Sequence, residues 1–202
     1  MRLSIVTLGH VHNEDIEKLT THFEHLEQLV LDIAPREPLA KHRAELNRAI
    51  DAASTDWILI IRERETIDEA LAAEIARVMA DGKARGFRLR AVPYYAGQPL
   101  QLTRDDGEVR LFHRRSYMRY ADKGEWEELT IQGTVVRLAS ALRSVTFATP
   151  EEHEQQLART GTRHSYPRRV LVFLGYALGA RVRDRNTLRY LWIEAAYTLP
   201  GS

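Results

Sequence analysis

The stretch DWILIIRERE, residues 56–65, decides the fold class of this chain. Its first half, from Trp57 to Ile61, is a short apolar run with β-branched residues, the pattern of a buried strand. Its second half, from Arg62 to Glu65, alternates arginine with glutamate. Similar apolar runs precede it, and helical patterns separate them. This alternation of strand and helix predicts an α/β fold with a parallel sheet covered by helices.

Two strand patterns lie upstream of this stretch. The run from Leu3 to Leu8 is apolar and begins at once, as a buried first strand does, and a brief second strand from Leu29 to Leu31 ends at Asp32. Between them Asn13 can cap a helix, for which we expect an apolar face of Ile16, Leu19, Phe23 and Leu26. Pro35 and Pro38 then break the chain before a helix striped by Leu39, Leu46, Ala49 and Ile50.

Downstream, Thr66 and Glu69 have the spacing of a capping box, and Gly82 and Gly86 end the helix that it predicts. Later strands are expected at residues 87–95 and 108–112, with a turn at residues 105–107 between them. A second capping pattern at residues 149–152 predicts a late helix.

The end of the chain is basic and apolar. From Arg159 onward there are eight arginines against Asp184 and Glu194, a balance of +6 that leaves −5 for the rest of a chain of net charge +1. The apolar run Val170 to Ala180 would reach about 16 Å as a helix, against roughly 30 Å of bilayer hydrocarbon, so it cannot span a membrane. The basic balance indicates an anionic partner, for which membrane phospholipid, nucleic acid and an acidic protein surface all qualify, and the apolar run with arginines at its margins suits an anionic membrane surface. The alternative is that these helices pack on the sheet and the arginines stay in water.

Composition limits the alternatives. With 202 residues and 44% apolar residues, the chain has the size and content of one compact globular domain. It has no cysteine, which excludes disulfides, thiolate metal sites and a cysteine nucleophile and fits a reducing compartment. The amino terminus turns polar too soon for a signal peptide, so we expect a cytoplasmic protein, or one peripheral to the inner face of the membrane.

Several phrases resemble family 2 glycosyltransferases of the GT-A fold, in particular the small bacterial branch that includes lipopolysaccharide core glucosyltransferases. The phrases lie at residues 3–7, 13–14, 56–59 and 108–112. The resemblance implies a GT-A-like, Rossmann-like and mainly parallel sheet flanked by helices. The resemblance covers roughly residues 3–165. Residues 1–165 form the expected glycosyltransferase-like domain, and residues 166–202 form the expected carboxy-terminal helices.

The resemblance also implies site residues. Nucleotide or phosphate contacts are expected at Asn13, Glu14, Asp32 and Asn47. The general-base carboxylate of the family would fall at Glu128, with Glu127 as its substitute, because an acceptor hydroxyl must lose a proton as it attacks the sugar. The alternative for these two glutamates is a solvated charge pair.

The sequence departs from the family where the metal would bind. Members carry an Asp-x-Asp after the strand that corresponds to Trp57 to Ile61, because carboxylate oxygens suit Mg²⁺ or Mn²⁺. Here Arg62 and Arg64 stand in place of both aspartates, and alternation would put them on one face of the strand. No metal cofactor is therefore expected. The two arginines either hold phosphate oxygens by charge-assisted hydrogen bonds or form ion pairs with Glu63 and Glu65.

Two functions stay open at this point. One is a family 2-like protein that either transfers a hexose from a nucleotide-sugar to a glycan or lipid-linked acceptor without a metal, or is a catalytically inactive relative. The other is a non-catalytic scaffold that docks on a membrane surface or a protein partner. Nucleic acid is not an expected partner. A histidine metal site among His10, His12, His22, His25 and His42 has no signature spacing to support it.

Overall fold

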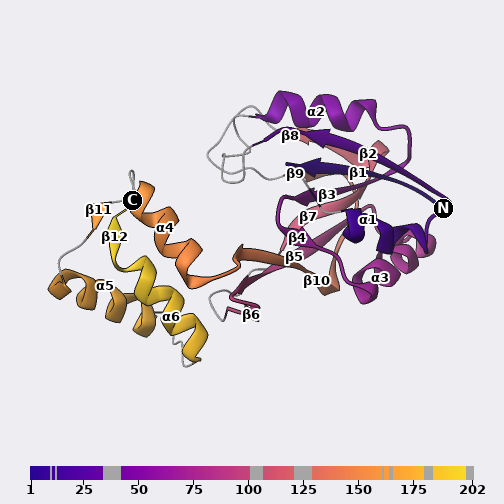
Figure 1. The fold of residues 1–202 in the computed structure, drawn as a ribbon. Helices are drawn as coiled ribbons and strands as arrows, with labels where there is room; N and C mark the ends of the chain where they lie inside the picture. The colour runs from indigo at the N-terminus through magenta and orange to yellow at the C-terminus, as the bar shows by residue number, and fades with distance from the viewer. Residues whose placement is uncertain are drawn as a thin grey trace. The chain divides into compact units, whose positions relative to one another are not determined.

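The computed structural model describes residues 1–9, 11, 13–33, 42–100, 107–120, 129–160, 162–163, 166–179 and 184–198. The fold is mixed α/β, with a curled sheet flanked by helices, as predicted (Figure 1). Contacts between residues divide the chain into two compact units. Unit 1 comprises Met1–Ala91 and Asp105–Arg143, and unit 2 comprises Val92–Arg104 and Ser144–Ser202.

The sheet is parallel where the sequence predicted it. Strand β1 (Arg2–Leu8) lies between β2 (His25–Leu31) and β3 (Trp57–Arg62) and pairs with both in parallel. Beyond β3 the direction changes. Strand β7 (Glu108–His113) pairs antiparallel with β3, and β5 (Gly86–Tyr95) pairs antiparallel with β7. The parallel pairing is thus confined to β2, β1 and β3, which is less of the sheet than the sequence predicted.

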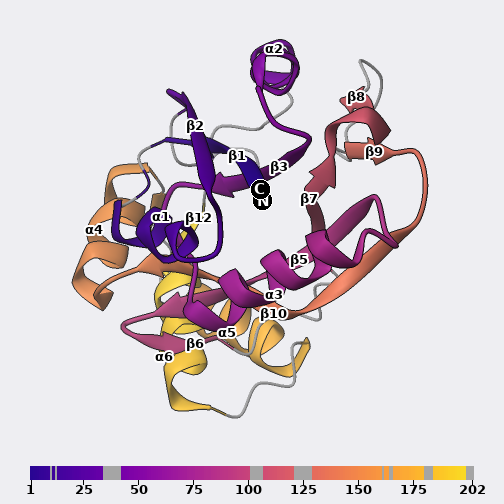
Figure 2. The ribbon, with the colours of Figure 1, turned by 90° about the vertical axis from the view of Figure 1, so that its right-hand side faces the viewer.

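Short or late strands complete the sheet, whose order is β2-β1-β3-β7-β5-β10-β4. They are β10 (Val135–Phe147), β4 (Glu65–Thr66) and β6 (Gln98–Pro99), the last of which pairs with β5. Figure 2 labels all of these strands except β4. A separate small sheet in unit 1 pairs β8 (Tyr117–Tyr120) with β9 (Leu129–Ile131), and a 3-10 turn (Arg114–Ser116) precedes it. Strand β10 was not predicted from the sequence pattern.

Helices cover both faces of the sheet in unit 1. Helix α2 (Arg43–Ala52) packs its buried residues Leu46, Ala49 and Ile50 against one face, and α1 (Asn13–Thr20) and α3 (Glu69–Asp81) cover the other. Alternation along β3 decides the partners of each residue, because Ile58 and Ile60 join the cluster around α2 and Leu59 and Ile61 join the cluster around α3. Strand β3 is therefore buried on both faces, as its composition predicted.

Two helix boundaries differ from the prediction. Helix α1 ends at Thr20, and Leu26 belongs to β2, so the expected helical stripe is cut short and the brief strand before Asp32 is in fact seven residues long. Helix α3 is capped by Asp68, which accepts a hydrogen bond from Leu71 N at 2.8 Å, and Thr66 lies in β4 instead. Its other end is as predicted, since Gly82 adopts a left-handed conformation with φ of 63°.

Unit 2 contains α4 (Pro150–Thr160), α5 (Tyr166–Gly179) and α6 (Arg185–Glu194), with α6 in contact with the other two. A short hairpin pairs β11 (Thr162–Arg163) with β12 (Tyr197–Thr198). The predicted cap of α4 is confirmed, because the Thr149 hydroxyl accepts a hydrogen bond from Glu152 N at 3.2 Å. The boundary that was expected between residues 165 and 166 falls inside unit 2, and the domain division it implies stays a prediction.

The core of unit 2 surrounds a buried histidine. His153 stacks between the rings of Phe147 and Tyr190 and meets the edge of Tyr95, and its Nε2 lies 2.9 Å from Glu194 Oε1. Burial raises the pKa of Tyr95 to about 12. This aromatic cluster gives a small unit a dense centre.

Within the described helices, none has the length and apolar content that would be needed to cross a bilayer.

Candidate functional site

The site expected from the sequence lies at the edge of the sheet where the parallel strands end. Strands β1, β2 and β3 run in the same direction, so Gly9, Asp32 and Arg62 all lie at this edge. The three chain segments are tied together there by backbone hydrogen bonds, from Gly9 N to Leu31 O at 2.8 Å and from Glu63 N to Leu8 O at 2.7 Å. Loops at the carboxyl ends of parallel strands are where α/β proteins commonly bind their ligands.

The chain turns directly after β3. The carboxylate of Glu65 accepts a hydrogen bond from Arg62 N at 2.7 Å, and Arg64 has a positive φ of 64°. The strand therefore ends at Arg62, and the expected alternation that would put Arg62 and Arg64 on one face does not reach Arg64. The prediction of a shared arginine face was wrong because the turn begins one residue after Arg62.

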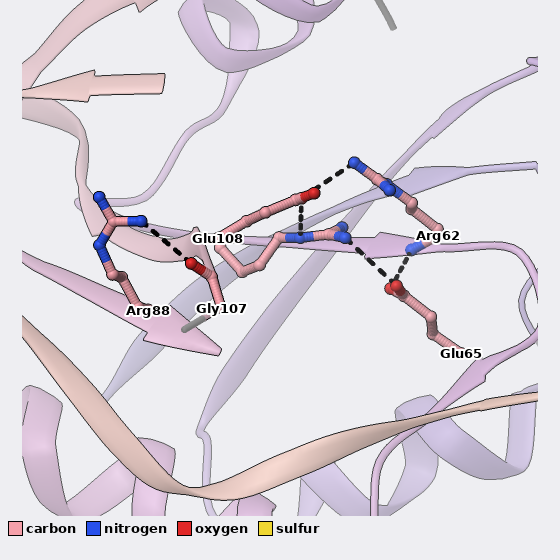
Figure 3. Close-up of polar contacts among 6 residues, drawn as sticks. Arg62, Glu65, Arg88, Gly107 and Glu108 are labelled. Carbon is pink, nitrogen blue, oxygen red and sulfur yellow. Dashed lines mark hydrogen bonds and ion pairs between the residues drawn. The ribbon is translucent and has the colours of Figure 1, made fainter. Parts of the chain in front are cut away.

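Arg62 belongs to a cluster of four charged side chains, which we call the arginine–glutamate cluster: Arg62, Glu65, Glu108 and Arg110 (Figure 3). Oε2 of Glu108 lies 2.9 Å from Nη2 of Arg62 and 2.9 Å from Nε of Arg110. Nη2 of Arg110 donates to Oε1 of Glu65 at 3.2 Å. One carboxylate oxygen of Glu108 thus bridges two guanidinium groups.

Burial separates the cluster into an inner and an outer pair. The side chains of Arg110 and Glu65 are 5% and 4% exposed, whereas those of Arg62 and Glu108 are 38% and 52% exposed. Buried charges are stable only when they are paired, and the inner pair meets this requirement. The outer pair faces solvent, where an ion pair contributes only about 0–1 kcal/mol. The four formal charges sum to zero.

The register of the sheet explains why the outer pair forms. Strands β3 and β7 pair antiparallel from Trp57 with His113 to Leu59 with Leu111. The same register continued along β3 brings Arg62 opposite Glu108. Opposite charges in facing positions of neighbouring strands attract each other, so the pair follows from the strand alignment.

The other predicted contact residues are placed as follows. Asn13 begins α1 and Glu14 is exposed on the same helix, while Asp32 is exposed one residue beyond β2. Asn47 is half-buried on α2. Glu127 and Glu128 lie outside the described residues, so the general-base assignment stays a prediction. Of the predicted set, Arg62 is the last residue of β3, Arg64 lies two residues beyond that strand, and Asp32 lies one residue beyond β2.

Three members of the cluster were not among the predicted site residues: Glu65, Glu108 and Arg110. A signal for two of them was present, because Glu108 and Arg110 are two positions apart on an expected strand and so share a face. That they would face Arg62 depends on the antiparallel pairing of β7 with β3. This pairing joins residues that are 46 positions apart, and periodicity does not report it.

Histidines and carboxylates do not gather into a metal site within the part of the chain that the structure describes, since no group of three or more could hold an ion there. His22 instead lies 2.9 Å from Glu69, and His42 lies 2.7 Å from Glu45. Two oxygens of the cluster, on Glu65 and Glu108, are already bound to arginines, which would repel a cation. The described residues therefore do not fit Mg²⁺ or Mn²⁺ at this edge.

A pocket of about 290 Å³ opens in unit 1 near the amino-terminal ends of β1 and β3. Trp57, His113 and Asp56 line it together with Arg2 and other residues. Burial, together with the positive charge of Arg85, lowers the pKa of His113. Trp57 meets the edge of the His113 ring at a centroid distance of 5.3 Å. Because the rings of Trp57 and His113, which line the pocket, already pack against each other, we assign no ligand to the pocket.

Comparison with known proteins gives a distant similarity in structure. No family model matches the chain. No curated protein matches it either. Three crystal structures of S. aureus TarS 1-349 have similar folds, one of them in complex with UDP-GlcNAc and one with UDP. Their identities to this chain are 11%, 10% and 9%, with TM-scores of 0.43, 0.46 and 0.47. The matches cover 96% of this chain and 71%, 79% and 81% of the TarS chains. At these scores the similarity carries no argument about activity.

Proposed function

We propose that this chain is a catalytically degenerate relative of the family 2 glycosyltransferases, with a GT-A-like sheet that no longer carries out metal-dependent sugar transfer. The observation that supports this is the arginine–glutamate cluster at the end of β3. The sequence resemblance puts the metal-binding Asp-x-Asp at this place. The cluster puts two guanidinium groups at this place, and both of its carboxylates, Glu65 and Glu108, are paired with them.

The charges of the cluster support the proposal that metal-dependent transfer has been lost. In a metal-dependent transferase the ion neutralises the diphosphate leaving group, and carboxylates hold the ion. Here Arg62 and Arg110 could supply positive charge directly, but each is paired with a glutamate. A nucleotide diphosphate would have to displace a carboxylate to gain either arginine. The resting site is therefore neither a metal site nor an open phosphate site.

The test is a titration of the protein with UDP- and GDP-sugars, with Mn²⁺ and with EDTA, combined with an assay for release of the nucleotide. We expect no turnover in either condition, and any binding that occurs should be the same in both, because no carboxylate pair is available to the ion. Turnover that requires Mn²⁺ would contradict the proposal. Turnover in EDTA would instead favour a metal-independent transferase, for which Glu128 or Glu127 would be the base to mutate.

A second candidate function is supported by an observation in unit 2. Helix α5 exposes two large apolar side chains, Leu171 with 70% and Leu174 with 45% of its surface accessible. They are three positions apart and so lie on one face of the helix. This face, in the basic end of the chain, favours docking on an anionic membrane surface. Docking is compatible with either a scaffold or a transferase that acts on lipid-linked acceptors.

A further inference from the structure

The bridging position of Glu108 points to a site for an anionic group. Oε2 of this side chain lies 2.9 Å from Arg62 and 2.9 Å from Arg110. Two guanidinium groups that converge on one oxygen have the geometry in which arginines hold phosphate or carboxylate groups of ligands. In this structure a side chain of the protein itself takes that position. Glu108 thus stands where an oxygen of a ligand would stand.

The inner arginine is held in place without Glu108. Arg110 donates to Glu65, and Glu65 also accepts from the backbone of Arg62, so both the turn and the buried pair have their own partners. If Glu108 moved away, the three remaining side chains, Arg62, Arg110 and Glu65, would carry a formal charge of +1. Arg62 also has its Nε buried without a hydrogen-bond acceptor among the described residues. An oxygen of a ligand could accept a hydrogen bond from Arg62 Nε, which Glu108 does not contact.

The backbone at Glu108 is fixed, while its side chain is half exposed. Gly107 has φ of 82°, and a Cβ there would lie 2.7 Å from the backbone of Leu89, so the chain rests closely on β5. Arg88 donates to Gly107 O at 3.0 Å from the other side (Figure 3). The backbone at the start of β7 is therefore fixed and places the Glu108 side chain beside Arg62 and Arg110. Rotation of the Glu108 side chain into solvent would leave the guanidinium groups of both arginines without this partner.

We propose that Arg62 and Arg110 form a binding site for a phosphate or diphosphate group, and that the Glu108 carboxylate occupies this site until the ligand displaces it. The choice of a diphosphate rather than another anion rests on the proposed function. Displacement breaks the solvent-exposed pair with Arg62, which is weak, while buried Arg110 keeps Glu65 as a partner. A diphosphate also carries more charge and more acceptor oxygens than one carboxylate.

The experiment uses inorganic pyrophosphate as the probe and calorimetry as the measurement. Glu108→Gln keeps the shape of the side chain but removes its charge, so pyrophosphate should bind about tenfold more tightly than to the native protein, the equivalent of about 1.4 kcal/mol. Glu63→Gln is the matched control. It removes the same charge at the same edge from a side chain that makes no ion pair within the described residues.

A gain in Glu108→Gln that is absent in Glu63→Gln, and that disappears in the double variant Glu108→Gln with Arg62→Gln, supports the site. An equal gain in both single variants, or no gain in either, overturns it. If Glu108→Gln fails to fold, Glu108→Asp takes its place, since a shorter carboxylate can no longer bridge both arginines and should give a smaller gain. Because pyrophosphate carries no sugar, these results are independent of whether the chain transfers one.

Discussion

A Cβ atom added to Gly9 would lie 2.6 Å from Oε2 of Glu63 and 3.0 Å from its Cβ. Gly9 has φ of 81°, a conformation that other residues rarely adopt. The end of β1 and the turn after β3 are therefore packed together without room for a side chain between them. This close approach holds the edge of the sheet at which the candidate site lies.

Gly9→Ala should destabilise the protein by about 1–3 kcal/mol for the backbone conformation alone, with an added cost from the contact with Glu63. Urea unfolding measures the loss. Gly82→Ala is the matched control, because Gly82 also has a positive φ, of 63°, but a Cβ there would meet nothing within 4 Å. If the two variants lose equal stability, the contact with Glu63 contributes nothing.

The amino-terminal cap of α3 provides a second test. Asp68 accepts from Leu71 N at 2.8 Å, so Asp68→Ala should cost about 0.5–2 kcal/mol of unfolding free energy. Thr66→Ala should cost less, since Thr66 lies in β4 and does not cap the helix. If Thr66→Ala lost more unfolding free energy than Asp68→Ala, the result would favour Thr66 as the cap, as the sequence predicted.

The misplaced cap illustrates what local patterns can and cannot predict. The sequence places two acceptable caps within three residues, Thr66 and Asp68, and spacing alone favours the first. Glu65 pairs with Arg110, and Glu65 and Thr66 together form β4, so Asp68 caps the helix instead of Thr66. The contact that decides the boundary comes from β7, far away in the sequence. By contrast, Trp57 to Ile61 could be predicted because its composition alone requires burial on both faces.

The pH dependence of stability should depend in part on Glu74. Burial alone would raise the pKa of its carboxyl, but hydrogen bonds from the backbone N–H groups of Ser140 and Ala139 outweigh burial and lower the pKa below the ordinary value of 4.5. A lowered folded-state pKa means that the charged form stabilises the fold. This contribution is fully present above pH 4.5 and is lost as the pH falls through the folded-state pKa.

Unfolding in urea at a series of pH values from about 7 to 3 checks this prediction. Glu74→Gln should be less stable than the native protein at neutral pH, and the difference should shrink as the solution becomes acidic. Glu17→Gln serves as the control because Glu17 is exposed on α1 and its side chain makes no ion pair among the described residues. A difference between native and Glu74→Gln protein that stays constant with pH would show that the charge of Glu74 is not involved.

As for the fold, part of the candidate site could be predicted from the sequence and part depends on contacts between distant residues. Arg62 and Arg64, which stand where the resemblance implies two aspartates, are visible in the sequence, and the prediction that no metal is held there follows from them. The sequence left open whether these arginines are paired, and structure resolves this for Arg62, whose partner is Glu108 rather than its neighbours in the chain. The partner of a side chain on a neighbouring strand depends on strand order and direction. Here β7 lies between β3 and β5 and pairs antiparallel with both.

The last prediction concerns the exposed face of α5. On the opposite face of this helix, the guanidinium of Arg169 lies 4.1 Å from the centre of the Trp192 ring, and Phe173 meets the edge of the same ring at 5.3 Å. These contacts fasten α5 to α6 and leave Leu171 and Leu174 in solvent. An apolar face in the arginine-rich end of the chain suits the interface of an anionic membrane, where each basic residue contributes about 1 kcal/mol.

Sedimentation with vesicles tests this docking. The protein should pellet with vesicles that contain an anionic phospholipid at low salt, stay in the supernatant with neutral vesicles, and be released as salt screens the charge. The double variant Leu171→Ser with Leu174→Ser should lose most of the binding. Val30→Ser, at a residue of unit 1 that is 54% exposed, should retain it. Equal binding to neutral vesicles, or full binding by the double variant, would mean that the exposed leucines of α5 are not a membrane surface and leave a protein partner as the explanation for them.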